Sequence, residues 1–289
     1  MPTNSPLGVR SRVGAPLAAE LVRRVAALAL ATGLTLATAG AVFGSTATAH
    51  SGGAIAMPRR VAAPESTART VPDALAVPAS VPTSAPTLPL LPDGLTSGVS
   101  ALSSEVRGYM TGRSWHVGCP VALDDLRLVI VTYAELGGPR LRRRTGPLVV
   151  HRAVAAKIAA VFDRLLAADF PIARVQLVDD FEADDDRSTL ANNTSAFNCR
   201  RAEGSTAWSQ HAFGRAVDVN PVENPYVYAD GTVLDPAAMP FRDRSASRGV
   251  PGVIADASPA VQAFAAVGWR WGGRWSGTKD YQHFSSNGR

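Results

Sequence analysis

Cysteine and lysine are both scarce in this chain. Its 289 residues include only two cysteines, Cys119 and Cys199, and two lysines, Lys157 and Lys279. Two cysteines are too few for a zinc site built on cysteine, which needs further ligands close by. In an oxidising compartment an even pair of cysteines indicates a disulfide, with two free thiols as the alternative. We therefore expect Cys119 and Cys199 to be joined.

The chain also lacks a stripe of basic residues interleaved with aromatic ones. Its formal net charge is +5, but residues 1–49 carry +3 of this and residues 50–100 are neutral. Residues 101–289 therefore keep only +2. Because nucleic-acid-binding domains ordinarily carry a clustered positive charge, we expect no nucleic acid among the partners. No internal repeat is visible.

The N-terminus has the pattern of an export signal. A basic region precedes an apolar run at 25–43, and Ala-Thr-Ala at 47–49 offers a cleavage site between small residues. The alternative is an uncleaved membrane anchor, because the apolar run is nearly long enough to span a bilayer. In both cases the arginines stay inside, so the rest is expected outside the cytoplasm, secreted or in the cell wall. These arginines are Arg10, Arg12, Arg23 and Arg24.

Residues 50–100 are rich in Pro, Ala, Ser, Thr and Val, and have neither a helical nor a strand period. Such a segment cannot bury a core and is predicted to be a disordered, extended linker. The remaining residues, 101–289, have the size of one ordinary domain. The predicted organisation is a signal or anchor at 1–49, a linker at 50–100 and one domain at 101–289, acting as a monomer.

Within this domain the patterns predict two helices and several short strands. The helices are expected at 154–170, from apolar spacing, and at 258–267, where Ser258 is a good N-cap, Pro259 fits the first turn and Gly268 the stop. Without a regular alternation of strand and helix, the expected class is α+β, a mainly antiparallel sheet with flanking helices. The strands are expected at 126–133, 173–178, 194–197, 216–219, 269–271 and 282–285.

Two histidines and two carboxylates form a candidate metal site. His211 and Asp218 are seven residues apart and cannot share a helix face, so we expect a loop carrying His211, a turn at Gly214 and a strand carrying Asp218. His283 would complete the set from a neighbouring strand, and such mixed nitrogen and oxygen ligands suit one zinc ion. Asp280, three residues earlier, is placed to take a proton from the attacking water.

Other polar residues have plainer interpretations. Asp280 itself has a structural alternative, a salt bridge to Arg274. His116 and His151 have no partner at ligand spacing and are expected to be ordinary polar residues. The acidic run at 179–186 lacks the calcium-loop pattern, so we expect a solvated loop.

Three motifs together resemble the M15 family of zinc peptidases, over about residues 170–289. This family comprises D-alanyl-D-alanine carboxypeptidases and dipeptidases, and L-alanyl-D-glutamate endopeptidases of bacteria and phages. Its fold is a small α+β domain, which agrees with the class expected above. The motifs are Ser209-x-His211-x-x-Gly214-x-Ala216-x-Asp218, Trp271-Gly-Gly-x-Trp275 and Asp280-x-x-His283-Phe284.

The resemblance implies a role for each of these residues. His211, Asp218 and His283 would be the zinc ligands and Asp280 the general base. The family also uses an arginine upstream of the histidine motif to steady the carbonyl oxygen in the transition state. Arg200 is the best match, although only ten residues separate it from His211, which is short for the family. The neighbouring Arg201 stays as the alternative.

The predicted function is an exported zinc metallopeptidase acting on the stem peptides of peptidoglycan. An aspartate at the base position and the Trp-Gly-Gly-x-Trp motif favour the L-alanyl-D-glutamate endopeptidase branch. A D-alanyl-D-alanine carboxypeptidase is one alternative. A non-catalytic zinc module that binds wall peptide or a protein is another, because hedgehog signalling domains have a related fold and zinc site. Ser209, Trp271 and Trp275 are expected at the substrate cleft, although tryptophans of this kind are more often core.

Overall fold

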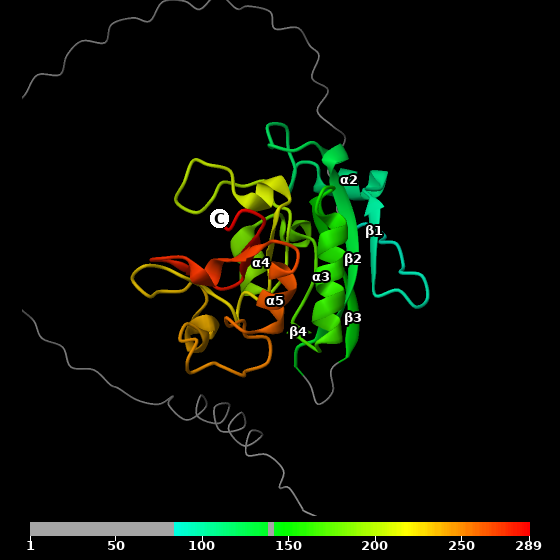
Figure 1. Ribbon diagram of the computed structural model, residues 1–289. Helices are drawn as coiled ribbons and strands as arrows, with labels where there is room; N and C mark the ends of the chain where they lie inside the picture. The colour runs from blue at the N-terminus through cyan, green and yellow to red at the C-terminus, as the bar shows by residue number, and fades with distance from the viewer. Residues whose placement is uncertain (1–83, 138–141) are drawn as a thin grey trace, which may run out of the picture. The chain divides into compact units, whose positions relative to one another are not determined.

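The computed structural model describes residues 84–137 and 142–289, and Figure 1 shows the arrangement of their elements. The predicted signal or anchor at 1–49 and most of the predicted linker lie outside the described residues. Within the described residues, none of the helices has the length and apolarity needed to cross a membrane.

The longest strands form one sheet in the first half of the described chain. Three strands run antiparallel in the order β1 (Ser97–Ala101), β2 (Leu126–Glu135) and β3 (Arg143–His151). The short strand β4 (Pro171–Ile172) pairs with β2 in parallel. Strand β1 begins at Ser97, so the sheet takes in the last residues that the sequence pattern assigned to the linker.

Strand β2 reads as a continuous apolar run because both of its faces are covered. Leu128 and Ile130 pack on one face with the helix α2 (Ser104–Met110), whereas Val129 and Val131 point to the other. The helix α3 (Ala155–Ala167) lies on that second face and runs alongside the long strands in Figure 1. This alternation is what the period-2 geometry of a strand dictates.

The helix α5 (Pro259–Ala265) packs against α3 and closes the larger core. Its N-terminus is formed as predicted: the Ser258 side chain accepts a hydrogen bond from the Val261 N–H. Phe264 on this helix stacks on Phe284 with ring centroids 4.0 Å apart. The core therefore reaches directly beneath the strand that carries His283.

Two small antiparallel sheets follow in the C-terminal half. One has the order β5 (Ala216–Asp218), β9 (His283–Ser285) and β7 (Arg270–Trp271). The other pairs β6 (Tyr226–Val227) with β8 (Lys279–Asp280). The 3-10 helices of the described residues are η1 (Leu123–Asp125), η2 (Val178–Phe181), η3 (Gln210–Phe213), η4 (Pro236–Phe241) and η5 (Gly272–Arg274).

Three expectations for the middle of the chain are wrong. The strands expected at 173–178 and 194–197 are reduced to isolated bridges, Val175 to Thr194 and Ser195 to Asp218. The acidic run is not a loop. It forms η2 and the start of α4 (Asp185–Leu190), whose N-cap Asp184 accepts a hydrogen bond from the Arg187 N–H. Aspartates cap helix starts well, so the same residues that suggested a solvated loop begin a helix.

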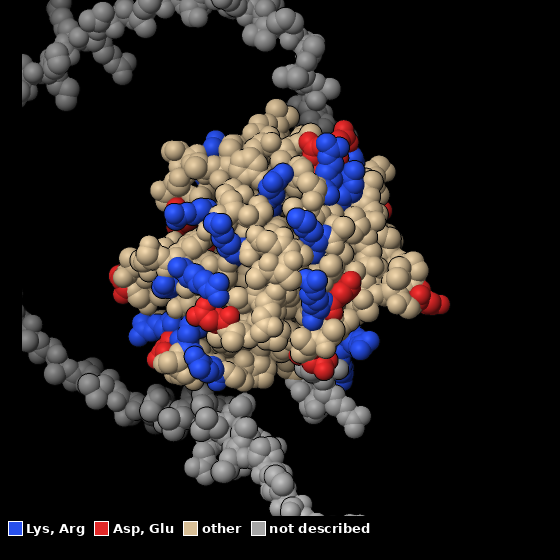
Figure 2. Space-filling view, viewed as in Figure 1, with Lys and Arg blue, Asp and Glu red and all other residues tan. Residues whose placement is uncertain are grey.

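The class is α+β, with mainly antiparallel sheets and helices packed on them, as predicted. On the face in Figure 2, lysine and arginine side chains are scattered among other residues rather than joined in one continuous stripe. Acidic side chains lie between several of them.

Candidate active site

His211 is held by a short helix whose two ends are both specified by the sequence. The Ser209 hydroxyl accepts a hydrogen bond from the His211 N–H at 3.3 Å and caps η3. Gly214 ends the helix with a φ of 61°, and a Cβ there would lie 2.6 Å from the His151 backbone nitrogen. Both the positive φ and the close approach require glycine. The turn expected at this position is confirmed.

Asp218 and His283 face each other across a strand pair. They are direct register partners in the antiparallel pairing of β5 with β9. Opposite residues on one face of such a pair have Cβ atoms about 4.5–5.5 Å apart, so their side chains meet. The prediction that His283 comes from a strand neighbouring that of Asp218 is confirmed.

The three predicted ligands bring their donor atoms to one point. His211 Nε2 lies 3.2 Å from His283 Nδ1 and 3.1 Å from Asp218 Oδ2, and His283 Nδ1 lies 3.0 Å from Asp218 Oδ1. Tetrahedral zinc with ligands at about 2.0–2.1 Å would place them roughly 3.3 Å apart. The donor set and its spacing fit a zinc ion, and all three side chains are buried.

Backbone carbonyls fix which nitrogen each histidine presents. His211 Nδ1 bonds the carbonyl oxygen of Ala196, and His283 Nε2 bonds that of Arg289 at 3.1 Å. A carbonyl can only accept, so in each ring the bonded nitrogen carries the proton and the other nitrogen keeps its lone pair for a metal. Carbonyl partners of this kind are typical of metal-binding histidines.

The metal-free site is electrostatically arranged to hold positive charge. Burial raises the pKa of Asp218, but His211 and His283 outweigh it and bring that pKa well below its usual value. Burial lowers the pKa of His283, whereas the Asp218 carboxylate raises it, and the net result is about 9. A metal must therefore displace a proton from His283, which makes binding weaker as the pH falls.

Asp280 lies beside this group but is not part of it. Its Oδ2 is 4.0 Å from His283 Nδ1, and its buried Oδ1 has no hydrogen-bond partner among the described residues. Burial raises the pKa of Asp280 to about 7. The salt bridge to Arg274 that was its structural alternative is not formed, because Arg274 pairs with Asp256 at 2.9 Å.

Glycines of the Trp-Gly-Gly-x-Trp motif let the chain approach Asp280. A Cβ on Gly272 would lie 2.6 Å from the Asp280 carbonyl oxygen, and one on Gly273 would lie 2.3 Å from the Trp271 ring. Nothing larger than glycine fits at either position without moving backbone or a packed ring. This motif therefore holds the backbone at Asp280 in place through close packing.

Arg200 and Arg201 point to different surroundings. Arg200 lines the cavity that contains the three ligands, and its guanidinium pairs with Asp185 at 2.8 Å. Burial lowers the Arg200 pKa, but nearby carboxylates, with Asp185 foremost, raise it above its usual value. Arg201 is exposed and stacks on Trp208, 3.6 Å from the ring centroid.

The cavity has a volume of about 320 Å³. Of the three residues expected at the cleft, Ser209 and Trp275 line it, and Trp271 does not. Trp271 is buried in the larger core and donates its indole N–H to the Tyr281 carbonyl, so packing accounts for it. Sequence reasoning did not single out several cavity residues, since no spacing marks them: Asp185, Tyr226, Gln282 and Arg289.

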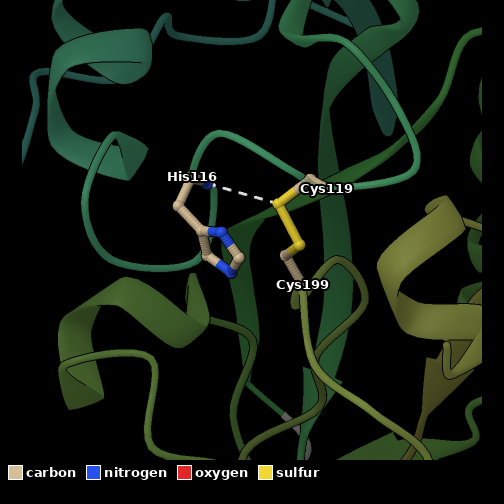
Figure 3. A group of neighbouring side chains, drawn as sticks. All are labelled: His116, Cys119 and Cys199. Atoms are coloured by element: carbon tan, nitrogen blue, oxygen red, sulfur yellow. Dashed lines mark hydrogen bonds between the residues drawn. A yellow bond between two sulfur atoms is a disulfide. The ribbon is translucent and has the colours of Figure 1, made fainter. Parts of the chain in front are cut away.

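Cys119 and Cys199 form the predicted disulfide, which Figure 3 shows with His116 beside it. The His116 N–H donates to Cys119 Sγ at 3.2 Å. These three residues also lie close enough to hold a metal. Because the two sulfurs are bonded to each other, they offer no thiolate, so the group is a disulfide site. His151 accepts a hydrogen bond from the Ala153 N–H on its ring Nδ1 and lies outside the cavity.

Comparison with known families finds a match for the segment that carries this site. The matching family model is an M15 peptidase model described as D-alanyl-D-alanine carboxypeptidase, and it covers residues 203–286. This match supports an M15 family peptidase. The matched segment contains His211, Asp218, Asp280 and His283, whereas Arg200 lies just before it. No curated protein and no solved structure matches the chain.

Proposed function

We propose that this protein is an exported zinc metallopeptidase that hydrolyses peptide bonds in the stem peptides of peptidoglycan. The observation that carries the proposal is the convergence of His211 Nε2, His283 Nδ1 and the Asp218 carboxylate in one cavity. The unpartnered oxygen of Asp280 beside them completes the set. A merely structural zinc site is closed by a fourth protein ligand, and none of the described residues supplies one here.

Zinc, when bound by His211, Asp218 and His283, supplies Lewis acidity that lowers the pKa of water and polarises a carbonyl. Asp280 is the general base that takes the proton of the attacking water and passes it to the leaving amine. A pKa near 7 in the metal-free protein suits both transfers. Arg200 donates hydrogen bonds to the oxygen of the scissile carbonyl as negative charge develops there.

Within this function we propose the L-alanyl-D-glutamate endopeptidase subtype, as the aspartate base and the Trp-Gly-Gly-x-Trp motif indicate. The description of the matching family model favours a second candidate, a D-alanyl-D-alanine carboxypeptidase. That activity needs a cation for the terminal carboxylate of the substrate. Arg289 lines the cavity and offers a guanidinium for this role, whereas Arg200 is assigned to the scissile carbonyl.

Purified muropeptides and the zinc-loaded protein test the proposal. New termini identified by mass spectrometry distinguish cleavage after L-alanine from release of D-alanine. The His211→Ala, His283→Ala double variant serves as the control, and should lose both the bound zinc, measured after dialysis, and the cleavage. Intact muropeptides with the wild-type protein would reject a wall peptidase and favour the non-catalytic module. Stoichiometric zinc in the double variant would reject the ligand assignment.

A further inference from the structure

Gln282 is a buried polar residue in the wall of the active-site cavity. Its side chain is only 7 % exposed, and its Oε1 has no hydrogen-bond partner among the described residues. Nearly all buried polar atoms in folded proteins are hydrogen-bonded, so such an atom needs an explanation. The residue lines the same cavity as the metal ligands, which makes a bound molecule the natural partner.

The backbone around Gln282 fixes the side chain in this place. The Gln282 carbonyl accepts the Val219 N–H at 3.0 Å, and the preceding Tyr281 N–H bonds the Pro225 carbonyl at 3.2 Å. Gln282 lies between the base Asp280 and the ligand His283, both of which are held by strand pairing. A shift of this segment along its pairing partners would move the Gln282 amide away from the cavity. The same shift would also misplace Asp280 and His283.

The cavity that Gln282 lines also includes apolar surface. Pro221, Pro225 and the ring of Tyr226 contribute to this surface. A methionine of similar length would fill the space without an unpaired oxygen. An amide, by contrast, offers one acceptor and two donors in one plane, which matches the donor and acceptor of a peptide bond.

We propose that Gln282 binds the backbone of the substrate peptide: its Oε1 accepts the N–H of a secondary amide close to the scissile bond. The proposal rests on the proposed peptidase function and deepens it. It makes Gln282 a substrate-binding residue that requires an unmodified amide next to the bond that is cut. It assigns no role in the proton transfers to Gln282, because the amide does not titrate.

The test compares the wild-type protein with Gln282→Met on a muropeptide that the wild type cleaves. A lost neutral hydrogen bond should lower kcat/KM roughly 3- to 10-fold. The loss should appear in KM with kcat little changed, because the contact is the same in the bound substrate and the transition state. Zinc content should be unchanged. Gln262→Met is the matched control, since Gln262 is exposed on α5 and its side chain donates to the Ala257 carbonyl, away from the cavity.

Substrates methylated singly on the amides that flank the scissile bond give a second, independent readout. Methylation of the contacted amide should cost the wild type a similar factor and cost Gln282→Met almost nothing, which is the coupling expected of a direct contact. Equal penalties in both proteins at every position would overturn the proposal, as would an unchanged KM in the variant. If Gln282→Met fails to fold, insensitivity of the wild type to each methylation overturns it.

Failure of the proposed function gives a different result. A wild-type protein that cleaves no muropeptide rejects the peptidase, whatever Gln282 does. Binding of the same peptides, measured by calorimetry on wild type and Gln282→Met, then decides the inference. Weaker binding by the variant supports it, and equal binding or none overturns it.

Discussion

Two backbone carbonyls determine the chemistry of the histidines. The oxygens of Ala196 and Arg289 hold the outer ring nitrogens of His211 and His283. When the rings are neutral, both inner nitrogens are thereby left with a lone pair, and both face Asp218. The side-chain types and their spacing are visible in the sequence, whereas nothing in the sequence marks Ala196 or Arg289 as carbonyl partners. At this scale the meeting of the three side chains was predictable, and the tautomers of the two rings were not.

Asp280→Ala should keep zinc and lose turnover. The carboxyl has one unpartnered buried oxygen beside the ligands, and a general base contributes roughly 10²–10⁴-fold to the rate. Steady-state kinetics together with metal analysis provide the measurement. Asp256→Ala is a matched control, because Asp256 pairs with Arg274 at the surface and should be nearly neutral. Near wild-type turnover in Asp280→Ala would remove the base assignment, and loss of zinc would make Asp280 a ligand.

Arg200→Ala should lower kcat far more than Arg201→Ala does. Arg200 lines the cavity, and removing one donor to a developing oxyanion costs about 10²–10³ in rate. Arg201 stacks on Trp208 and bonds the Thr206 carbonyl, so its loss should change kcat less than about threefold. Kinetics with zinc content checked in both variants decide between them. A larger loss from Arg201→Ala would reverse the assignment, and two small losses would exclude both residues from the oxyanion.

Among the elements, the pairing of β5 with β9 brings the two halves of the site together. Segments 65 residues apart, at Asp218 and His283, become direct neighbours in this pair. Short apolar stretches predicted these strands and α5, because periodicity and capping residues are local signals. The sequence patterns did not predict strand β3. The strand begins with polar residues and a glycine, Arg143 to Gly146, and it is held as a strand by its pairing with β2. Pairing with a neighbouring strand thus sets the conformation of this segment, which the local strand propensity does not specify.

The disulfide should stabilise the fold and support the site. Cys119 and Cys199 are separated by 80 residues, for which chain entropy alone gives roughly 4.5 kcal/mol. The Cys119→Ser, Cys199→Ser double variant should therefore unfold at lower urea concentration. It should also be less active, because Cys199 directly precedes Arg200. Reducing agent should lower the stability and the activity of the wild type, and should change neither in the variant. Free thiols at both positions in exported protein would contradict the pairing.

On the scale of the whole described molecule, a buried carboxyl links the N-terminal helix region to the disulfide segment. Asp179 accepts hydrogen bonds from the Ser114 N–H at 3.1 Å and from the Ser114 hydroxyl at 2.9 Å. Ser114 in turn accepts the Cys199 N–H on its carbonyl at 2.9 Å. Stability at this point should therefore depend on the charge of one side chain.

The contribution of Asp179 to the free energy of unfolding should fall as the pH rises from about 4 to 7. Burial raises the pKa of Asp179 from its usual 3.8 to about 6, and the Ser114 hydrogen bonds only partly offset this. The folded state therefore binds the proton more tightly than the unfolded state. The penalty for ionising Asp179 is absent below the unfolded pKa and complete above the folded one. Between pH 4 and pH 7 this penalty lowers the free energy of unfolding by about 2 kcal/mol.

Asp179→Asn isolates this effect, because other groups titrate equally in both proteins. Urea unfolding of wild type and variant at pH 4 and pH 7 gives the four free energies required. The wild type should lose about 2 kcal/mol more than the variant between these pH values. The loss of one acceptor oxygen for Ser114 lowers the variant's stability at both pH values and cancels in the comparison. Parallel pH profiles would show that Asp179 is ionised in the fold at low pH and that its hydrogen bonds to Ser114 outweigh its burial.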